Sequence, residues 1–507
     1  MSSRRFIPLP SSHPHDTEGW QKVYSDIRKA LVRSVKQVER ETRASAISGR
    51  DSVYVGNSGV AFMQYHLASL DLGFSNSKLS PTTQEILGPD SLRVKADQNL
   101  FAVVRQNRIP AAVKDGSRCS FLETPVGVAT LILRRCLESL SRPRYSENEN
   151  ILANLRKWWK PSLELLLGTL QCIPSEDRDE ELMDEDGCEV LYGRAGFLYA
   201  LLLLRKEVEK VKGLKAYREE MEEGHKEGLE VVVSDKMLGV AVESLIARGR
   251  YGAKAYEGEL GGAAAQEGHG LPPLMWKWHG RRYLGGAHGV AGILQMLLEC
   301  PRSVIEPHVP DVVSTIGWLV GLQDTDGNFP SKAPSLSRPN PDNELIQWCH
   351  GAPAVVTLIS TTLHLDSQLF TLSSDLRSRF LSSLKRGADL IYERGLLRKG
   401  LGLCHGVAGS VYTLLAASTI LDLPEHNSSP SGSSSPYFKK AIHLAHLATL
   451  ADQLVEEGAM RVPDRPWSLY EGLAGMCCAW GEIFHRLNGD AGSRRVSSGM
   501  PGYDDLR

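Results

Sequence analysis

Apolar residues recur along this chain with the 3.6-residue period of helices. In segments such as 382–394 and 437–456, an apolar face alternates with a charged one. Runs of alternating Val, Ile or Thr bounded by turns, which would mark strands, are nearly absent. The pattern therefore predicts an all-α protein. The clearest apolar face, with spacings i, i+3, i+4, i+7 and i+8, consists of Val290, Ile293, Leu294, Leu297 and Leu298.

A Gly-x-x-Gly motif opens the apolar helices and recurs along the chain. Because glycine lacks a Cβ, it permits a tight turn and close packing where each helix starts. In one copy Ala354 replaces the second glycine, so the conformation of that turn stays open. Two copies are degenerate and contain Gly127 and Gly351. The complete copies begin at Gly56, Gly193, Gly289, Gly406 and Gly472.

The spacing of the copies predicts a repeat architecture. Successive copies lie 55 to 96 residues apart, with a typical unit of roughly 60 residues. Each unit has room for one apolar and one amphipathic helix. Seven such hairpins, with the apolar helices inside, predict an α/α toroid, a double-layered helical barrel. An open solenoid is the competing geometry.

The composition of the connecting segments suggests one domain with additions. We expect an N-terminal segment at 1–50 and the barrel at 51–487. Insertions are expected near 205–270, which is rich in charges of both signs and then in Gly and Ala, and near 423–436, which is rich in Ser and Pro. Residues 488–507 are expected to form a flexible tail.

Composition narrows the function classes. The formal net charge is −2, so charge gives no reason to expect nucleic acid as a partner. No apolar run has the length of a transmembrane helix, and no secretory signal opens the chain. The nine cysteines are too scattered for a disulfide scaffold. We therefore expect a cytoplasmic protein whose thiols are free to bind metal.

Two Cys-His pairs stand directly before helix-opening glycines. Cys404 and His405 precede Gly406, and Cys349 precedes His350 about 50 residues earlier in the chain. Two thiolates and an imidazole suit Zn²⁺, and three protein ligands leave a fourth tetrahedral position open, as in catalytic zinc sites. The alternative is that these cysteines are buried core thiols. Spacing alone leaves both readings open.

Five segments carry a resemblance to a known family: 189–196 (EVLYGRAG), 283–292 (YLGGAHGVAG), 348–353 (WCHGAP), 402–406 (GLCHG) and 468–475 (SLYEGLAG). They resemble the eukaryotic lanthionine synthetase C-like family, relatives of the bacterial LanC cyclases. The resemblance implies a seven-fold α/α barrel and a zinc ion on Cys349, Cys404 and His405. It also implies addition of thiols, glutathione in particular, to dehydroalanine or dehydrobutyrine residues of formerly phosphorylated peptides or proteins.

The resemblance also assigns roles to single residues. It places a catalytic histidine at His288, which would protonate the α-carbon after thiol attack. Glu189 lies where the bacterial cyclases carry an acid, although a carboxylate that stabilises a helix N-terminus is an equal alternative. Lys399 matches a lysine that the family points at its peptide or phosphate ligand, although an exposed lysine on a solvated turn is an equal alternative. Glu471 matches the Glu-Gly of the family's last repeat, and Arg4 or Arg5 resembles its N-terminal arginine, so Lys399, Glu471 and Arg4 are the candidate ligand-binding residues. His350 stays unassigned between a supporting and an acid/base role.

Three function classes remain. The first is a zinc-dependent transferase that joins a thiol to a dehydroamino acid as a thioether. The second is a non-catalytic adaptor that binds glutathione or phosphopeptides through the same zinc site. The third is a glycoside hydrolase or terpene cyclase on a similar toroid, which would need paired carboxylates or Asp-rich repeats that the chain does not show. An intact His288 favours the enzyme, because an adaptor needs no proton donor.

Overall fold

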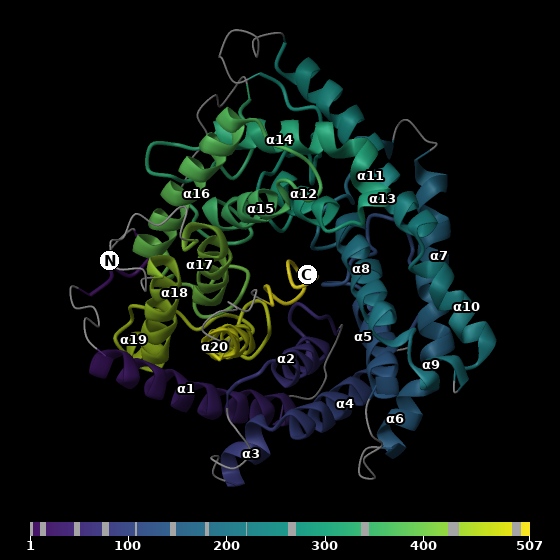
Figure 1. The fold of residues 1–507 in the computed structure, drawn as a ribbon, viewed down its shortest axis with the longest axis vertical. Coiled ribbons are helices and arrows are strands. Elements are labelled where there is room, and N and C mark those ends of the chain that lie inside the picture. Colours follow the sequence, from purple (N-terminus) through teal and green to yellow (C-terminus); the bar gives the residue numbers. More distant parts are fainter. Residues whose placement is uncertain are drawn as a thin grey trace.

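The protein is a helical toroid in which an inner layer of helices is wrapped by an outer one (Figure 1). Among the described residues, extended pairing is limited to isolated bridges. None of the described helices combines the length and the apolar character of a membrane span. The computed structural model describes residues 4–10, 17–44, 51–73, 81–106, 109–141, 149–177, 182–219, 221–261, 270–335, 344–423, 435–488 and 498–507.

Seven helices form the inner layer, and each begins at a predicted glycine motif. Their residues are buried almost throughout, and all of α12 is buried, because these helices contact other helices on every side. The predicted apolar inner helices are therefore confirmed. They are α2 (Asn57–Ser69), α5 (Pro125–Glu138), α8 (Arg194–Val211), α12 (Val290–Leu298), α15 (Ala352–Leu365), α17 (Val407–Leu421) and α20 (Leu473–Leu487).

The inner layer is a closed ring. Each inner helix contacts the next one along the chain, and α20 contacts α2. An open solenoid has two free ends and no such contact. The closed toroid that the sequence predicted is confirmed.

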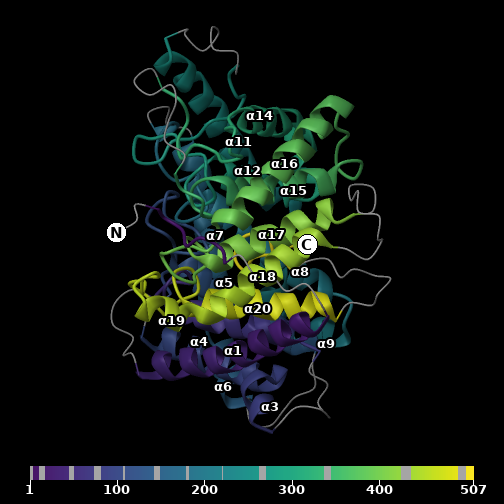
Figure 2. The ribbon, with the colours of Figure 1, turned by 90° about the vertical axis from the view of Figure 1, so that its left-hand side faces the viewer.

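The outer layer consists of one long helix before each inner helix. Figure 2 shows α1 lying alongside α20, which agrees with their extensive packing. Shorter helices join the layers. The outer helices are α1 (Thr17–Ala44), α4 (Pro89–Gln106), α7 (Trp159–Glu176), α11 (Asp235–Glu259), α14 (Val309–Gly321), α16 (Ser374–Arg394) and α18 (Pro436–Leu447). The shorter helices are α3 (Pro81–Leu87), α6 (Glu149–Arg156), α9 (Lys215–Glu219), α10 (Glu223–Val232), α13 (Arg302–Ile305) and α19 (Ala451–Glu456).

The segment before residue 51, expected as separate from the barrel, contributes an outer helix to the toroid. Helix α1 is the outer helix of the first hairpin and packs against α20 and α18. Its apolar face, with Val23, Ile27, Leu31 and Val38 at most 2% exposed, has the helical period that the sequence showed. Helix α1 therefore covers the seam between the first and last hairpins.

The structure can be compared with three further predicted segments. The region near 205–270, expected as an insertion, contains the regular outer helix α11, and the additional helices among its described residues are α9 and α10. Most of the insertion near 423–436 lies outside the described residues. The tail was expected to be flexible from residue 488, but 498–507 are packed against the inner helices, and five of these ten residues are buried. That expectation is wrong for these ten residues because they fill the lumen of the ring, as described below.

The second glycine of each motif is required by close backbone approach. At Gly59, Gly196, Gly292 and Gly409, an added Cβ would overlap the carbonyl oxygen six residues earlier. The fifth motif solves this differently. Its first glycine, Gly351, has a φ of 95°, whereas the corresponding glycines of the complete motifs have φ between −98° and −124°. In this motif the close approach falls on Gly351 itself, because an added Cβ would overlap the carbonyl oxygen of Leu345.

Replacing Gly292 with alanine should destabilise the toroid. The new Cβ would overlap the carbonyl oxygen of Gly286, so the backbone must shift, at a cost of about 1–3 kcal/mol. Gly239 is the matched control, because it lies inside α11 with nothing within 4 Å of an added Cβ. Gly239→Ala should raise stability by about 0.5–1 kcal/mol. Thermal unfolding checks both changes, and equal melting temperatures for the two variants would contradict this explanation.

Candidate metal centre and active site

A ring of backbone hydrogen bonds joins the loops that precede the seven inner helices. Each loop donates an N–H to a carbonyl of the next loop, and the last loop donates back to the first. All seven inner-helix N-termini therefore open on one end of the toroid. The donor and acceptor pairs are Tyr54 to Leu122 (3.0 Å), Ser120 to Tyr192 (2.9 Å), Leu191 to Ala287 (3.1 Å), Gly286 to Trp348 (3.1 Å), Cys349 to Cys404 (3.3 Å), Cys404 to Tyr470 (2.8 Å) and Tyr470 to Tyr54 (3.1 Å).

The ring gives equivalent positions in the seven loops. The residue two places before the helix cap is buried in every loop, and Cys349 and Cys404 occupy this position. The residue directly before the cap is partly exposed in every loop. We call this second set the mouth residues, and they carry most of the predicted chemistry. The mouth residues are Val55, Glu123, Tyr192, His288, His350, His405 and Glu471.

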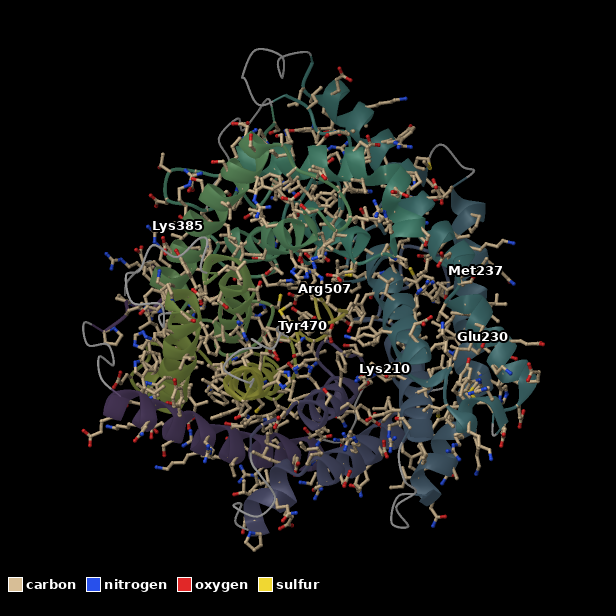
Figure 3. The ribbon with its side chains drawn as sticks, in the orientation of Figure 1. Lys210, Glu230, Met237, Lys385, Tyr470 and Arg507 are labelled. Atoms are coloured by element: carbon tan, nitrogen blue, oxygen red, sulfur yellow. The ribbon has the colours of Figure 1, made fainter. Side chains whose placement is uncertain are left out.

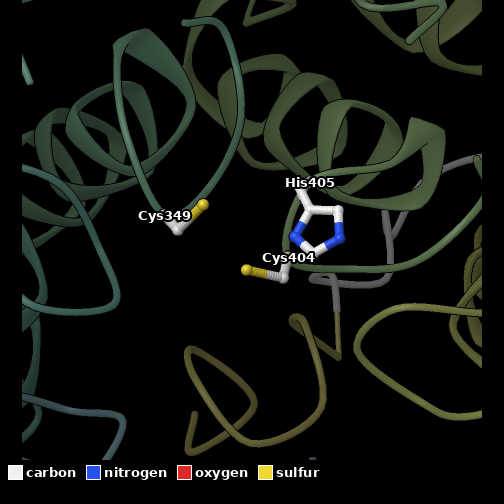
Figure 4. Close-up of side chains that lie close together, drawn as sticks. All are labelled: Cys349, Cys404 and His405. Atoms are coloured by element: carbon white, nitrogen blue, oxygen red, sulfur yellow. The ribbon is translucent and has the colours of Figure 1, made fainter. Parts of the chain in front are cut away.

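Cys349, Cys404 and His405 converge at one point (Figure 4). One sulfur from each cysteine and one ring nitrogen of His405 all lie within 4.8 Å of one another. Cys349 and Cys404 are 7% and 3% exposed. Burial, with a further contribution from the Cys349 thiol, raises the pKa of Cys404 well above its usual value. Two adjacent buried thiolates need a cation between them, and the S, S, N donor set fits Zn²⁺.

His288 lies beside Glu189. Its Nδ1 is 3.6 Å from a Glu189 carboxylate oxygen, beyond hydrogen-bonding distance but within range of an ion pair. That oxygen accepts a hydrogen bond of 2.9 Å from the Tyr192 N–H. Among the described residues, His288 Nδ1 and the second Glu189 oxygen have no hydrogen-bond partner.

Trp278 covers the face of His288 and was missed from the sequence. The two rings are nearly parallel, at 10°, with centroids 3.8 Å apart. A short backbone pairing between Trp278 and Arg281 holds the indole in place. His279 between them has a φ of 48°, a conformation that the sequence does not reveal. No motif marks Trp278, so only the fold identifies it.

His350 faces the same end of the toroid. Burial lowers its pKa to about 4, and the nearby charges of His288, Lys332 and Lys399 act in the same direction. The imidazole is therefore neutral at pH 7. Its ring lies 5.4 Å from that of Tyr283.

Arg4 and Lys399 come from distant parts of the chain and lie opposite each other. Phe6 pairs with Leu397 in an antiparallel bridge, and the Ile7 N–H donates to the Leu396 carbonyl at 2.8 Å. In this register Arg4 lies across from Lys399, and both are exposed. Glu471 is the mouth residue of the seventh loop, next to Tyr470. The structure thus brings Arg4 and Lys399 together and places Glu471 at the end that carries the metal ligands.

Comparisons with known proteins agree with this architecture. A protein called LanC-like protein GCL1, from Arabidopsis thaliana, is 28% identical over 336 residues, which cover 65% of this chain and 62% of that protein. A protein named glutathione S-transferase LANCL1, from Danio rerio, is 27% identical over 292 residues, which cover 57% of this chain and 56% of that protein. The chain thus matches less than two thirds of the length of either relative.

One solved structure and one family model also match this chain. The structure of a nisin cyclase superposes with a TM-score of 0.51 and 13% identity, covering 95% of this chain and 98% of that one, so it supports the fold alone. The family model described as lanthionine synthetase C-like protein matches residues 154–487. These residues include both cysteine loops, His288 and Glu189. The chain belongs to the lanthionine synthetase C-like family.

Proposed function

We propose that this protein is a zinc-dependent enzyme that adds a thiol, that of glutathione, to dehydroalanine or dehydrobutyrine residues of peptides or proteins. The product is a thioether. The observation that carries the proposal is the convergence of Cys349, Cys404 and His405 within 4.8 Å. A relative named as a glutathione S-transferase supports the choice of thiol.

The three ligands leave room for a substrate sulfur. A zinc ion held by Cys349, Cys404 and His405 would ionise a thiol bound at the fourth position, which in water has a pKa of about 8.5. The cysteines are held rigidly, because the Cys349 N–H donates to the Cys404 carbonyl and both loops belong to the backbone ring. His405 is partly exposed, so the site is open to the end of the toroid where the mouth residues lie.

His288 is the proton donor in this proposal. Attack of the thiolate on the β-carbon forms the C–S bond and moves the electron pair to the α-carbon, which must then gain a proton. His288 gives that proton, and Glu189 orients the imidazole through Nδ1 at 3.6 Å. Glu189 is only 1% exposed, so its carboxylate is held firmly.

Trp278 should hold the imidazole of His288 in place. Trp278→Ala removes the ring stacked 3.8 Å away and is expected to lower kcat about tenfold, with zinc content unchanged. Trp278→Phe keeps an aromatic face and should recover most of the rate. Steady-state kinetics with a dehydroalanine peptide checks both variants. An equal loss in the alanine and phenylalanine variants would argue against stacking as the cause.

Arg4 and Lys399 are proposed to bind an anionic group of the substrate. Both side chains are exposed, so their charges are accessible to a bound substrate. Glutathione offers two carboxylates for these cations. Glu471 supplies a carboxylate at the same end of the toroid, suited to the α-ammonium group of glutathione.

The proposal is tested by incubating the purified protein with glutathione and a dehydroalanine peptide. The peptide should gain the mass of one glutathione, and prior removal of metal with a chelator should stop the reaction. A zinc-containing protein that binds glutathione but leaves the peptide unchanged would instead favour the non-catalytic adaptor.

A further inference from the structure

The C-terminal segment 498–507 occupies the lumen of the toroid. Figure 1 shows the C-terminus at the centre of the ring, and Figure 3 shows Tyr470 and Arg507 in the same place. Its hydrogen bonds reach four inner helices or their ends. The partners are Tyr199 and Lys206 of α8, Glu299 after α12, Thr361 of α15 and Glu482 of α20.

Polar contacts hold the segment in place. The Tyr199 hydroxyl donates to Asp505 at 2.8 Å, and Lys206 donates to the Asp505 carbonyl at 2.9 Å. Arg507 pairs with Glu299 at 3.1 Å, and the Ser498 N–H donates to Glu482 at 2.9 Å. Glu299 and Lys206 are charged groups in a confined space, so their pairing with the segment opposes its release.

The segment contacts the loop that carries Cys349. The Tyr503 ring packs edge-on against Trp348, with centroids 5.2 Å apart and an angle of 81°. Trp348 directly precedes Cys349 and is 2% exposed. Tyr503 is itself only 1% exposed, so its ring is enclosed at this contact.

The segment also contacts the loop that supports Cys404. The Tyr470 hydroxyl donates to the Pro501 carbonyl at 2.9 Å, while the Tyr470 carbonyl accepts the Cys404 N–H at 2.8 Å. Tyr470 and Trp348 also pack edge-on, 5.5 Å apart. One aromatic cluster, formed by Trp348, Tyr470 and Tyr503, therefore contacts the loops of both cysteines.

We propose that residues 498–507 hold the two cysteine loops at the spacing that zinc requires, with Tyr503 as the positioning residue. The inference rests on the proposed zinc site. Without the Tyr503 ring, Trp348 would face an open space and its loop would lose a packing partner. Partners that orient metal ligands commonly change metal affinity about 10- to 100-fold when they are removed.

The test is the rate at which the folded holoprotein releases zinc to an excess of a chromophoric chelator. Tyr503→Ala should release zinc about 10- to 100-fold faster than the wild type. Tyr503→Phe keeps the ring and should behave as the wild type. If the alanine variant does not fold, Tyr503→Leu keeps apolar volume without the ring and carries the same expectation.

A second control separates positioning from general stability. Leu245 is fully buried in the outer helix α11, so Leu245→Ala should lower the melting temperature without changing zinc release. Wild-type release from Tyr503→Ala, or equally fast release from Leu245→Ala, would overturn this inference and leave the zinc site standing. A wild type that contains no zinc would overturn the proposed function, and this inference with it.

Discussion

Replacing Cys404 with alanine is expected to lower the rate of glutathione addition on the order of 10³-fold. The variant keeps Cys349 and His405, but two ligands hold zinc poorly. Glutathione would then react as a free thiol, only a few per cent ionised near pH 7 because its pKa is about 8.5, and without a fixed position beside the peptide. Mass spectrometry of the modified peptide measures both rates.

The pH dependence gives this prediction a second readout. The residual rate of Cys404→Ala should rise with pH up to about 8.5, because the thiolate fraction of free glutathione rises there about tenfold per unit. The wild type should show a much weaker rise, since its thiol is already ionised. Cys300→Ala is the control, because Cys300 is also buried but lies outside the metal-ligand cluster. An unchanged rate in Cys404→Ala would show that the reaction does not depend on zinc.

Replacing His288 with asparagine should lower kcat about 10²–10⁴-fold, the usual contribution of a general acid. Zinc content should stay at the wild-type level, because His288 is not one of the three clustered ligands. Asparagine keeps a polar side chain of similar size but cannot supply a proton from a titratable ring. Single-turnover kinetics measures the loss, with metal analysis of the same sample.

The control for His288 is the same substitution at His364, in the last turn of α15 and thus far from the N-terminal end that carries the mouth residues. His364→Asn should retain full activity. Loss of zinc from His288→Asn would show that His288 supports the metal rather than the proton transfer. A normal kcat with bound zinc would show that His288 is not the proton donor.

The fold was predictable where one physical signal repeats. Seven glycine motifs, each followed by an apolar helical period, led to seven inner helices and a closed ring. The outer helix α1 was missed because no glycine motif marks its start. Its residues Val23, Ile27 and Leu31 nevertheless carry a clear helical period. The tail was misjudged because Tyr503 and Arg507 read as surface residues until the lumen exists to receive them.

In the candidate site, too, some residues were predictable from the repeat and others were not. Cys349, Cys404, His405 and His288 precede helix-opening glycines, so the repeat itself brings them to one end of the toroid. Trp278 carries no such mark. Its place above His288 depends on a tight turn at His279 and on packing between loops, and such contacts do not follow from spacing along the chain.

Metal analysis of the wild-type protein, purified without chelators, tests the central claim most directly. The convergence of Cys349, Cys404 and His405 predicts about one zinc ion per chain, and its absence from the Cys404→Ala variant. A wild type that contains no zinc, or a Cys404→Ala variant that keeps it, would contradict the account.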